Sequence, residues 1–164
     1  DPTAKVVLGG LSGSGVNAEG TGYLQQLYRL GGAAYFDVIS IHHYIHPAIE
    51  DNIERLQASL AATRQVMDNN GDGDVPLWLT EIGWSDAPDA WGQPTAAQNE
   101  IAAYLTRVYT ELPADKIFWY NFRNVFDDSP DVEHNFGLVY NNFTTKPSYE
   151  ALAAVACVCD STSP

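Results

Sequence analysis

The chain alternates between two kinds of hydrophobic pattern. Short apolar runs, rich in β-branched and aromatic residues, occupy 4–10, 36–44, 75–84 and 116–122. Between these runs, apolar residues recur every three or four positions, which is the spacing of one face of an α-helix. Glycine, asparagine and proline separate the two kinds of segment. The pattern therefore predicts four β-strands, each followed by an α-helix.

Residues at the ends of the helical segments indicate where the helices begin and end. The first helix, at 22–32, closes on two glycines, and the second ends at an Asn-Asn-Gly sequence. Thr95 and Gln98 have the spacing of a capping box for the third helix, and Pro147 lies near the first turn of the fourth. The residues expected to face the core are Leu24, Leu27 and Leu30, then Ile53, Leu56, Leu60 and Met67, then Ile101, Leu105, Val108 and Leu112, and lastly Tyr149, Leu152 and Val155.

Four consecutive βα units follow from this pattern, at about 4–32, 36–70, 75–112 and 116–157. Such units predict an α/β fold with a parallel sheet, and strands that are apolar nearly throughout fit a sheet covered on both faces. An open doubly wound sheet and a segment of a (β/α)8 barrel, which needs about 250 residues when complete, both accommodate these units. We expect residues 1–164 to form a single domain.

Polar and aromatic side chains gather where the predicted strands end. His42 and Tyr44 follow the second strand, and Glu81 ends the third. The carboxyl ends of parallel strands share one edge of a sheet, and the active sites of βα proteins lie at that edge. Strand alternation predicts that His42 and Tyr44 lie on one face and His43 on the other.

Glu81 is the acidic residue at the end of the apolar run PLWLTEIGWS, residues 76–85. Alternation predicts that it extends an inward row formed by Leu77 and Leu79. A buried carboxylate without partners is costly, and the Tyr44 hydroxyl and a histidine of the neighbouring strand are the groups able to bind it.

Composition and charge exclude several classes of partner. The net charge is -13, and the eight lysines and arginines are scattered along the chain, so no nucleic acid partner is expected. No apolar run reaches the length that spans a bilayer, so no membrane contact is expected either. A chain that starts without methionine and is acidic and rich in aromatic residues leans towards an exported protein, either extracellular or periplasmic.

The sequence predicts neither a metal nor a cofactor. His42 and His43 face apart on a strand and therefore cannot bind one ion together. The acidic segment 68–74 opens like a calcium-binding loop, but its twelfth position is Leu79, so a turn between helix and strand is expected. Cys157 and Cys159 match neither a redox nor a zinc motif, and on a helix their side chains would point apart.

Three segments together resemble the C-terminal half of retaining glycoside hydrolases of clan A, closest to families 39 and 5 and related cellulase-like barrels. They are FDVISIHHY, PLWLTEIGWS and the long segment that begins FWYNFRNVFDD. The resemblance implies that Glu81 is the nucleophile and that His42 and Tyr44 bind substrate or hold that carboxylate. It also implies that Trp119 forms the floor of a sugar subsite, although alternation leaves Tyr120 as a rival. The remaining substrate-binding residues that it implies are Trp84 and Asn121.

One element of the family pattern is missing from the sequence. Clan A enzymes take their general acid/base from the end of strand four, commonly in an Asn-Glu-Pro sequence, which this chain lacks. The resemblance therefore implies that the four βα units are strands five to eight, the C-terminal half of a (β/α)8 TIM barrel, and that the catalytic domain is partial. Asp127 and Glu133 are conceivable substitutes, but loop acids in an acidic protein are usually solvated.

The leading hypothesis is hydrolysis of O-glycosyl bonds in β-linked oligo- or polysaccharide with a retaining mechanism. The alternatives are a non-catalytic carbohydrate-binding half-barrel module and an open-sheet nucleotide-binding domain. A half-barrel would expose strand edges and apolar inner residues, for which we expect Val7, Ile39 and Leu79. The expected partner is the missing N-terminal half-barrel or a second copy in a dimer.

Overall fold

The computed structural model describes residues 1, 3–12, 19–88 and 95–160. Within them, strands and helices alternate along the chain, with one 3-10 turn, Gly32–Tyr35, after the first helix and another, Val132–His134, in the last loop. None of the helices in these ranges is both long enough and apolar enough to cross a bilayer. The elements are β1 (Leu11–Ser12), α1 (Glu19–Arg29), β2 (Ile39–His42), α2 (Asn52–Asn69), β3 (Leu77–Ile82), α3 (Gln98–Glu111), β4 (Lys116–Trp119) and α4 (Pro147–Asp160).

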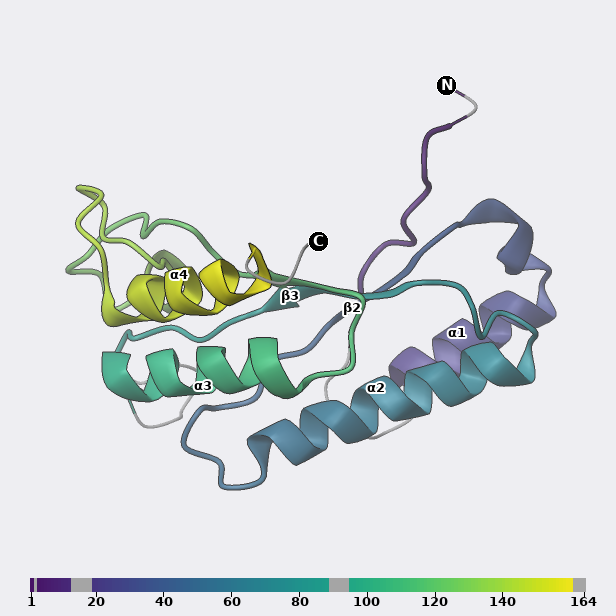
Figure 1. The fold of residues 1–164 in the computed structure, drawn as a ribbon, viewed down its shortest axis with the longest axis horizontal. Helices are drawn as coiled ribbons and strands as arrows, with labels where there is room; N and C mark the ends of the chain where they lie inside the picture. The colour runs from purple at the N-terminus through teal and green to yellow at the C-terminus, as the bar shows by residue number, and fades with distance from the viewer. Residues whose placement is uncertain (2, 13–18, 89–94, 161–164) are drawn as a thin grey trace. The chain divides into compact units, whose positions relative to one another are not determined.

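The four strands form one sheet in the order β1-β2-β3-β4. The two pairs β1 with β2 and β2 with β3 are parallel, as expected for strands joined by helices. Each strand is followed along the chain by a helix, and Figure 1 labels two of these strands, β2 and β3, with the helices α2 and α3 that follow them. The predicted α/β fold is therefore confirmed.

The chain divides into two compact units. The first consists of Asp1–Tyr44, Glu54–Ile82 and Pro113–Phe118, and therefore holds β1, β2, β3 and most of β4. The second consists of Ile45–Ile53, Gly83–Leu112 and Trp119–Pro164, and holds α3 and α4, which pack against each other (Figure 1). That residues 1–164 form a single domain stays a prediction.

The core of the first unit lies against the strands. Ile39, Leu77 and Leu79 are at most 1% exposed, and Leu60 and Met67 of α2 are buried as the helical spacing predicted. The expectation that Ile39 and Leu79 lie on an exposed inner face was therefore wrong, because they belong to the apolar core. The helical spacing was wrong for Leu30, which lies just beyond the end of α1 and is 75% exposed.

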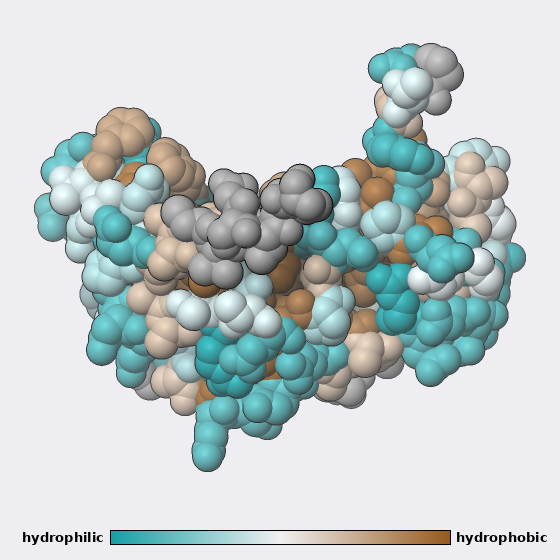
Figure 2. All heavy atoms as spheres, in the orientation of Figure 1, coloured by the Kyte–Doolittle hydropathy of each residue, from teal (hydrophilic) through white to brown (hydrophobic). Residues whose placement is uncertain are grey.

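The residues next to them in sequence point the other way. Trp78 alternates with Leu77 and Leu79 along β3, and its ring lies 5.8 Å from the ring of Phe118 on β4. Phe118 is 45% exposed and Val7 is 38% exposed. Figure 2 shows hydrophobic side chains, in brown, reaching the surface among hydrophilic ones.

The first and last strands are shorter than the sequence predicted. The run 4–10 contributes one isolated bridge, Val7 with Val38, and β1 itself begins after the two glycines. The fourth strand ends at Trp119 rather than at residue 122. There, the Asn121 N–H donates to the Phe136 carbonyl oxygen of the following loop, at 3.2 Å, and no longer to a strand.

The predicted cap of the third helix was also wrong. The helix begins at Gln98 with Ala97 as its N-cap, and the Ala97 N–H donates to the Glu100 carboxylate at 2.8 Å. The capping pair is therefore Ala97 with Glu100, two residues later than the predicted pair of Thr95 with Gln98. Pro147 does begin α4 as predicted. The side chains of Cys157 and Cys159 lie outside the described residues.

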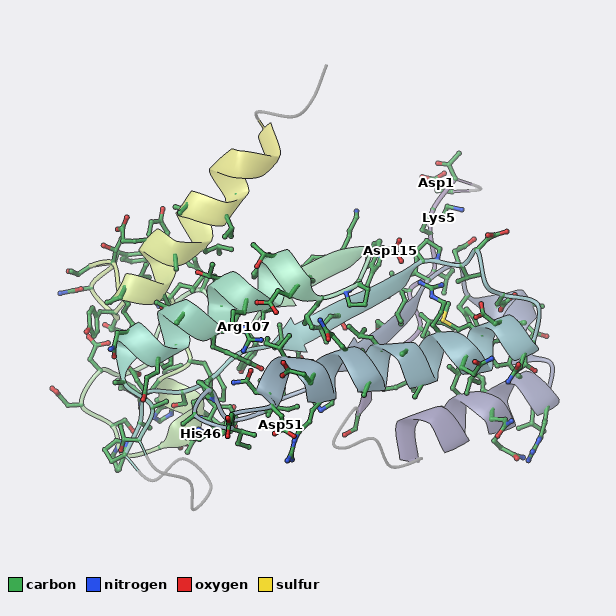
Figure 3. The ribbon with its side chains drawn as sticks, turned by 60° about the horizontal axis from the view of Figure 1, so that its bottom comes forward. Asp1, Lys5, His46, Asp51, Arg107 and Asp115 are labelled. Carbon is green, nitrogen blue, oxygen red and sulfur yellow. The ribbon has the colours of Figure 1, made fainter. Side chains whose placement is uncertain are left out.

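Ionic contacts fix the start of the third and fourth strands to the end of the second helical segment. The Asp115 carboxylate, labelled in Figure 3, accepts from the Leu77 N–H at 2.7 Å and lies 3.3 Å from the Arg64 guanidinium. Arg64 also donates to the Val75 carbonyl oxygen at 2.7 Å. These contacts join the turn before β3 to the start of β4. The predicted turn between helix and strand is confirmed, with Gly71 at a φ of 84°.

Candidate active site

An extra residue in β3 determines where Glu81 points. Ile41 of β2 pairs with Leu79, but the next residue, His42, pairs with Glu81, so Thr80 has no partner of its own in β2. This is a β-bulge, which turns the side chains that follow it to the opposite alternation.

Because of the bulge, the Glu81 side chain does not lie on the strand face that the sequence predicted. Leu79 and Ile82 are both fully buried. They are three residues apart, so strict alternation would put them on opposite faces of β3. The Glu81 side chain is 37% exposed. Glu81 therefore does not extend the row of Leu77 and Leu79, as the sequence analysis expected; it lies on the opposite side of β3 from that buried row.

Two side chains from the end of β2 meet the Glu81 carboxylate. The Tyr44 hydroxyl donates to Oε2 at 2.9 Å, and Nδ1 of His42 lies 3.3 Å from the same oxygen. The backbone supports the pairing, because the His43 N–H donates to the Glu81 carbonyl oxygen at 3.0 Å. The sequence predicted both contacts, since His42 and Tyr44 share a strand face.

The arrangement leaves one oxygen of the carboxylate available. Both contacts converge on Oε2, and within the described ranges Oε1 of Glu81 has no hydrogen-bond donor. A carboxylate that is oriented by one hydrogen bond and a neighbouring imidazole, and that is 37% exposed, is a group that can attack an electrophilic carbon. The geometry therefore suits a nucleophile whose second oxygen is held in place.

His43 lies on the other side of β2 and does not belong to this cluster. It is 2% exposed, and burial lowers its pKa from 6.5 to about 4. Its Nδ1 has no hydrogen-bond partner among the described residues. His43 is therefore a neutral imidazole of the core, as alternation with His42 predicted.

The predicted aromatic residues of the second unit lie in different surroundings. Trp84 is 5% exposed, and its ring packs edge-on against His46 at 4.9 Å. Trp119 packs against Tyr104 of α3 at 6.2 Å. Tyr120, the next residue, packs instead against Phe136 at 5.3 Å, so the two neighbours point to different groups. Asn121 is half-buried, and its backbone N–H and carbonyl oxygen bond to the loop at Phe136 and Leu138.

A buried lysine in the second unit was missed by the sequence analysis. Lys146 is fully buried, and its Nζ donates to both carboxylate oxygens of Asp86 at 3.1 Å and to Oδ1 of Asn124 at 3.0 Å. Burial lowers the pKa of Lys146 and the Asp86 carboxylate opposes that shift. One lysine in a polar turn carries no sequence signal of burial, so only the fold reveals it.

The loop acids that could substitute for a missing acid have structural contacts. Oδ1 of Asp127 accepts from Nδ2 of Asn124 at 3.1 Å and from the Asn141 N–H at 2.8 Å, which braces the loop after β4. A surface hollow of about 300 Å³ opens beside this loop. Its polar lining includes Asp86, Asp128 and Tyr140. Among the described residues, no group of His, Cys, Asp and Glu side chains has the arrangement of a metal site.

Comparison with known proteins matches the chain to glycoside hydrolases. A family model of the glycosyl hydrolase catalytic core matches residues 2–144. A family 39 glycoside hydrolase from the gut symbiont Bacteroides cellulosilyticus WH2 has a similar structure, with a TM-score of 0.73 and 30% identity, over 95% of this chain and 34% of that one. No curated protein is similar enough in sequence to match.

More distant structures share the fold. A glucosidase from Croceicoccus marinus has a TM-score of 0.67 and 18% identity over 96% of this chain and 32% of its own. GH5_18 from Streptomyces cattleya, solved in complex with GlcNAc, has a TM-score of 0.57 and 17% identity over 79% of this chain and 32% of its own. The chain spans about a third of the length of each of these proteins. The predicted resemblance to glycoside hydrolases of families 39 and 5 is confirmed.

The buried imidazole of His43 predicts how stability depends on pH. Because its pKa is about 4 in the folded chain and 6.5 when exposed, the unfolded chain binds more protons between these values, and stability falls as the pH falls through that window. We expect His43 to cost about 2 kcal/mol of unfolding free energy between pH 7 and pH 5. Urea unfolding of wild type and His43→Gln at both pH values measures this. An equal pH dependence of the two proteins would contradict a neutral, buried His43.

Proposed function

Because the chain belongs to the glycosyl hydrolase catalytic core family, we propose that it is part of a retaining glycosidase in which Glu81 is the nucleophile. The observation that carries this proposal is the Glu81 carboxylate at the end of β3, with Oε2 bound by Tyr44 and close to His42. The family match supports the class of reaction, and the oriented carboxylate supports Glu81 as the residue that performs it.

The proposed reaction has two steps. Oε1 of Glu81 attacks the anomeric carbon, the glycosidic bond breaks, and a general acid gives its proton to the departing oxygen, which leaves an ester between sugar and enzyme. Water then attacks the same carbon and gives a proton to the former general acid, which now acts as a general base. The ester bond breaks, the carboxylate is restored, and the sugar keeps its original configuration. Tyr44 holds Oε2 throughout, so the attacking oxygen stays oriented.

The general acid/base is proposed to come from polypeptide outside residues 1–164. Retaining hydrolysis needs two carboxyl groups about 5 to 5.5 Å apart, and the chain has no Asn-Glu-Pro sequence to supply the second. Asp127, one of the two acids that could substitute for it, accepts hydrogen bonds that brace its own loop. Positioned acid/base catalysis contributes at least about 10²-fold. The isolated chain should therefore hydrolyse ordinary glycosides at least about 10²-fold more slowly than a complete barrel.

The same reasoning leads us to propose that the four βα units are a half-barrel, strands five to eight of eight. The chain spans about a third of its structural relatives, which leaves room in those proteins for the other strands. The partly exposed Trp78 and Phe118, on the side of the sheet away from Leu77 and Leu79, support a face that further strands would cover. A missing N-terminal half-barrel is the proposed partner, and a second copy takes its place in the isolated chain.

The proposed substrate is a β-linked oligo- or polysaccharide. The residues proposed to bind the sugar are His42, Tyr44, Trp84, Trp119 and Asn121, with Tyr120 as the rival of Trp119. Trp119 packs against Tyr104 and Tyr120 against Phe136, so both stay candidates for the floor of the sugar subsite. The loops 85–94 and 123–136 are proposed to select the sugar. Export from the cell stays a prediction, which fractionation of the source cells would test.

The assignment of Glu81 predicts where a trapped sugar attaches. A 2-fluoro glycoside with a dinitrophenyl leaving group does not need a general acid, because this leaving group departs without a proton. Incubated with a panel of such sugars, the chain should form a stable ester at Glu81, located by mass spectrometry of its peptides. Glu81→Gln should lower the labelling rate by at least about 10⁴-fold, as removal of a nucleophile does.

Asp74→Asn is the matched control, because it removes an exposed acid in the turn before β3, at the opposite end of that strand from Glu81, and should leave labelling unchanged. Labelling at any other residue, or equal labelling of Glu81→Gln, would contradict the assignment. Oligosaccharide binding that is equally tight in wild type and Glu81→Gln, without any labelling, would favour the carbohydrate-binding module instead.

The half-barrel proposal predicts self-association of the isolated chain. Exposed strand edges and the partly exposed rings of Trp78 and Phe118 favour contact with a second copy. Sedimentation velocity at increasing concentration should show a species larger than the monomer. Phe118→Ser should shift the equilibrium towards monomer, whereas Tyr35→Ser, at a ring that is 78% exposed on a 3-10 turn, should not. A wild-type chain that remains monomeric at every concentration would overturn the proposal.

A further inference from the structure

Gly10 lies directly against the imidazole of His42. A Cβ added at Gly10 would collide with three atoms of that ring, Nε2, Cδ2 and Cε1. On the other side of the ring, Nδ1 lies 3.3 Å from Oε2 of Glu81. We propose that Gly10 is a positioning residue for the Glu81 nucleophile, because the space left by its missing side chain seats the imidazole against the carboxylate.

The backbone on both sides of this contact is fixed. The Leu8 N–H donates to the Val38 carbonyl oxygen at 2.9 Å, and the Ser40 hydroxyl donates to the Leu8 carbonyl oxygen at 2.6 Å. On the other side of Gly10, Leu11 pairs with Ile41 in the sheet. Gly10 therefore cannot move away from β2 to make room for a side chain without breaking sheet contacts.

The imidazole is the part that can move. All three atoms that a Cβ would meet belong to the far end of the His42 side chain, which is 33% exposed and rotates about two single bonds. A methyl group at residue 10 would therefore displace the ring rather than the backbone. The displaced ring loses its contact with Oε2, and Glu81 keeps only the hydrogen bond from Tyr44.

The neighbouring glycine provides a matched comparison. Gly9 has open space where its Cβ would lie, since no atom among the described residues comes within 4 Å. Neither Gly9 nor Gly10 has the positive φ that only glycine adopts easily, so alanine is compatible with the backbone at both positions. The two substitutions thus differ mainly in whether they meet His42.

The effect of Gly10 on the Glu81 nucleophile rests on the proposed function, but the packing of His42 against Gly10 can be tested without catalysis. The experiment records the imidazole ¹⁵N and ¹H resonances of His42 in wild type, Gly9→Ala and Gly10→Ala, assigned with a His42→Gln variant. Gly10→Ala should shift the His42 resonances, whereas Gly9→Ala should leave them unchanged. Unshifted His42 resonances in a folded Gly10→Ala protein would overturn the proposal.

The labelling reaction then tests the consequence for Glu81. Gly10→Ala should slow ester formation with the fluoro glycoside by up to about 10²-fold, the effect of a misplaced reacting group. In a His42→Ala background the same change should have no further effect, because the ring that it displaces is absent. An equal slowing with and without His42 would overturn the proposal.

Two further outcomes are separated by the design. If Gly10→Ala does not fold, the double variant Gly10→Ala/His42→Ala should fold, since the collision is with the imidazole, and failure of the double variant would overturn the proposal. If wild type is not labelled at all, the proposed function fails, and the His42 resonances alone decide whether Gly10 seats the ring.

Discussion

The site depends on one residue of β3, Thr80, which has no register partner in β2. Without it, Glu81 would follow Leu79 by strict alternation and would point into the apolar core, where an ionised carboxylate is costly. With it, the apolar row ends at Leu79 and resumes at Ile82, and Glu81 reaches the polar end of β2. The bulge therefore keeps the apolar side chains of β3 buried while it places the Glu81 carboxylate beside its polar partners. Bulges occur frequently beside active sites.

The contacts of Glu81 show what a sequence can predict. Tyr44 and His42 were expected beside Glu81 because parallel strands end at a common edge and because residues two apart share a strand face. Both expectations used only the order of the strands and the alternation of side chains along each strand. The side on which Glu81 leaves β3 was predicted wrongly, since a period of two assumes a regular ladder, and no residue in the run LWLTEI signals that Thr80 will be unpaired.

Contacts between residues that are distant along the chain could not be predicted from the sequence either. The burial of Lys146 depends on Asp86 and Asn124, which are far from it along the chain, so no local pattern contains that contact. The packing of Gly10 on His42 likewise joins residues that are far apart along the chain. Helix spacing, in contrast, is a local property, and Leu56, Leu60 and Met67 of α2 were predicted correctly.

The central claim is that the Tyr44 hydroxyl binds the Glu81 carboxylate across the two strands. A double-mutant cycle on the free energy of unfolding, with Tyr44→Phe and Glu81→Gln, tests it most directly. The account predicts a coupling of at least about 0.5 kcal/mol. It predicts none when Tyr44→Phe is combined with Asp74→Asn, which changes an exposed acid in the turn before β3. A Tyr44–Glu81 coupling no larger than that of the control pair would contradict the account.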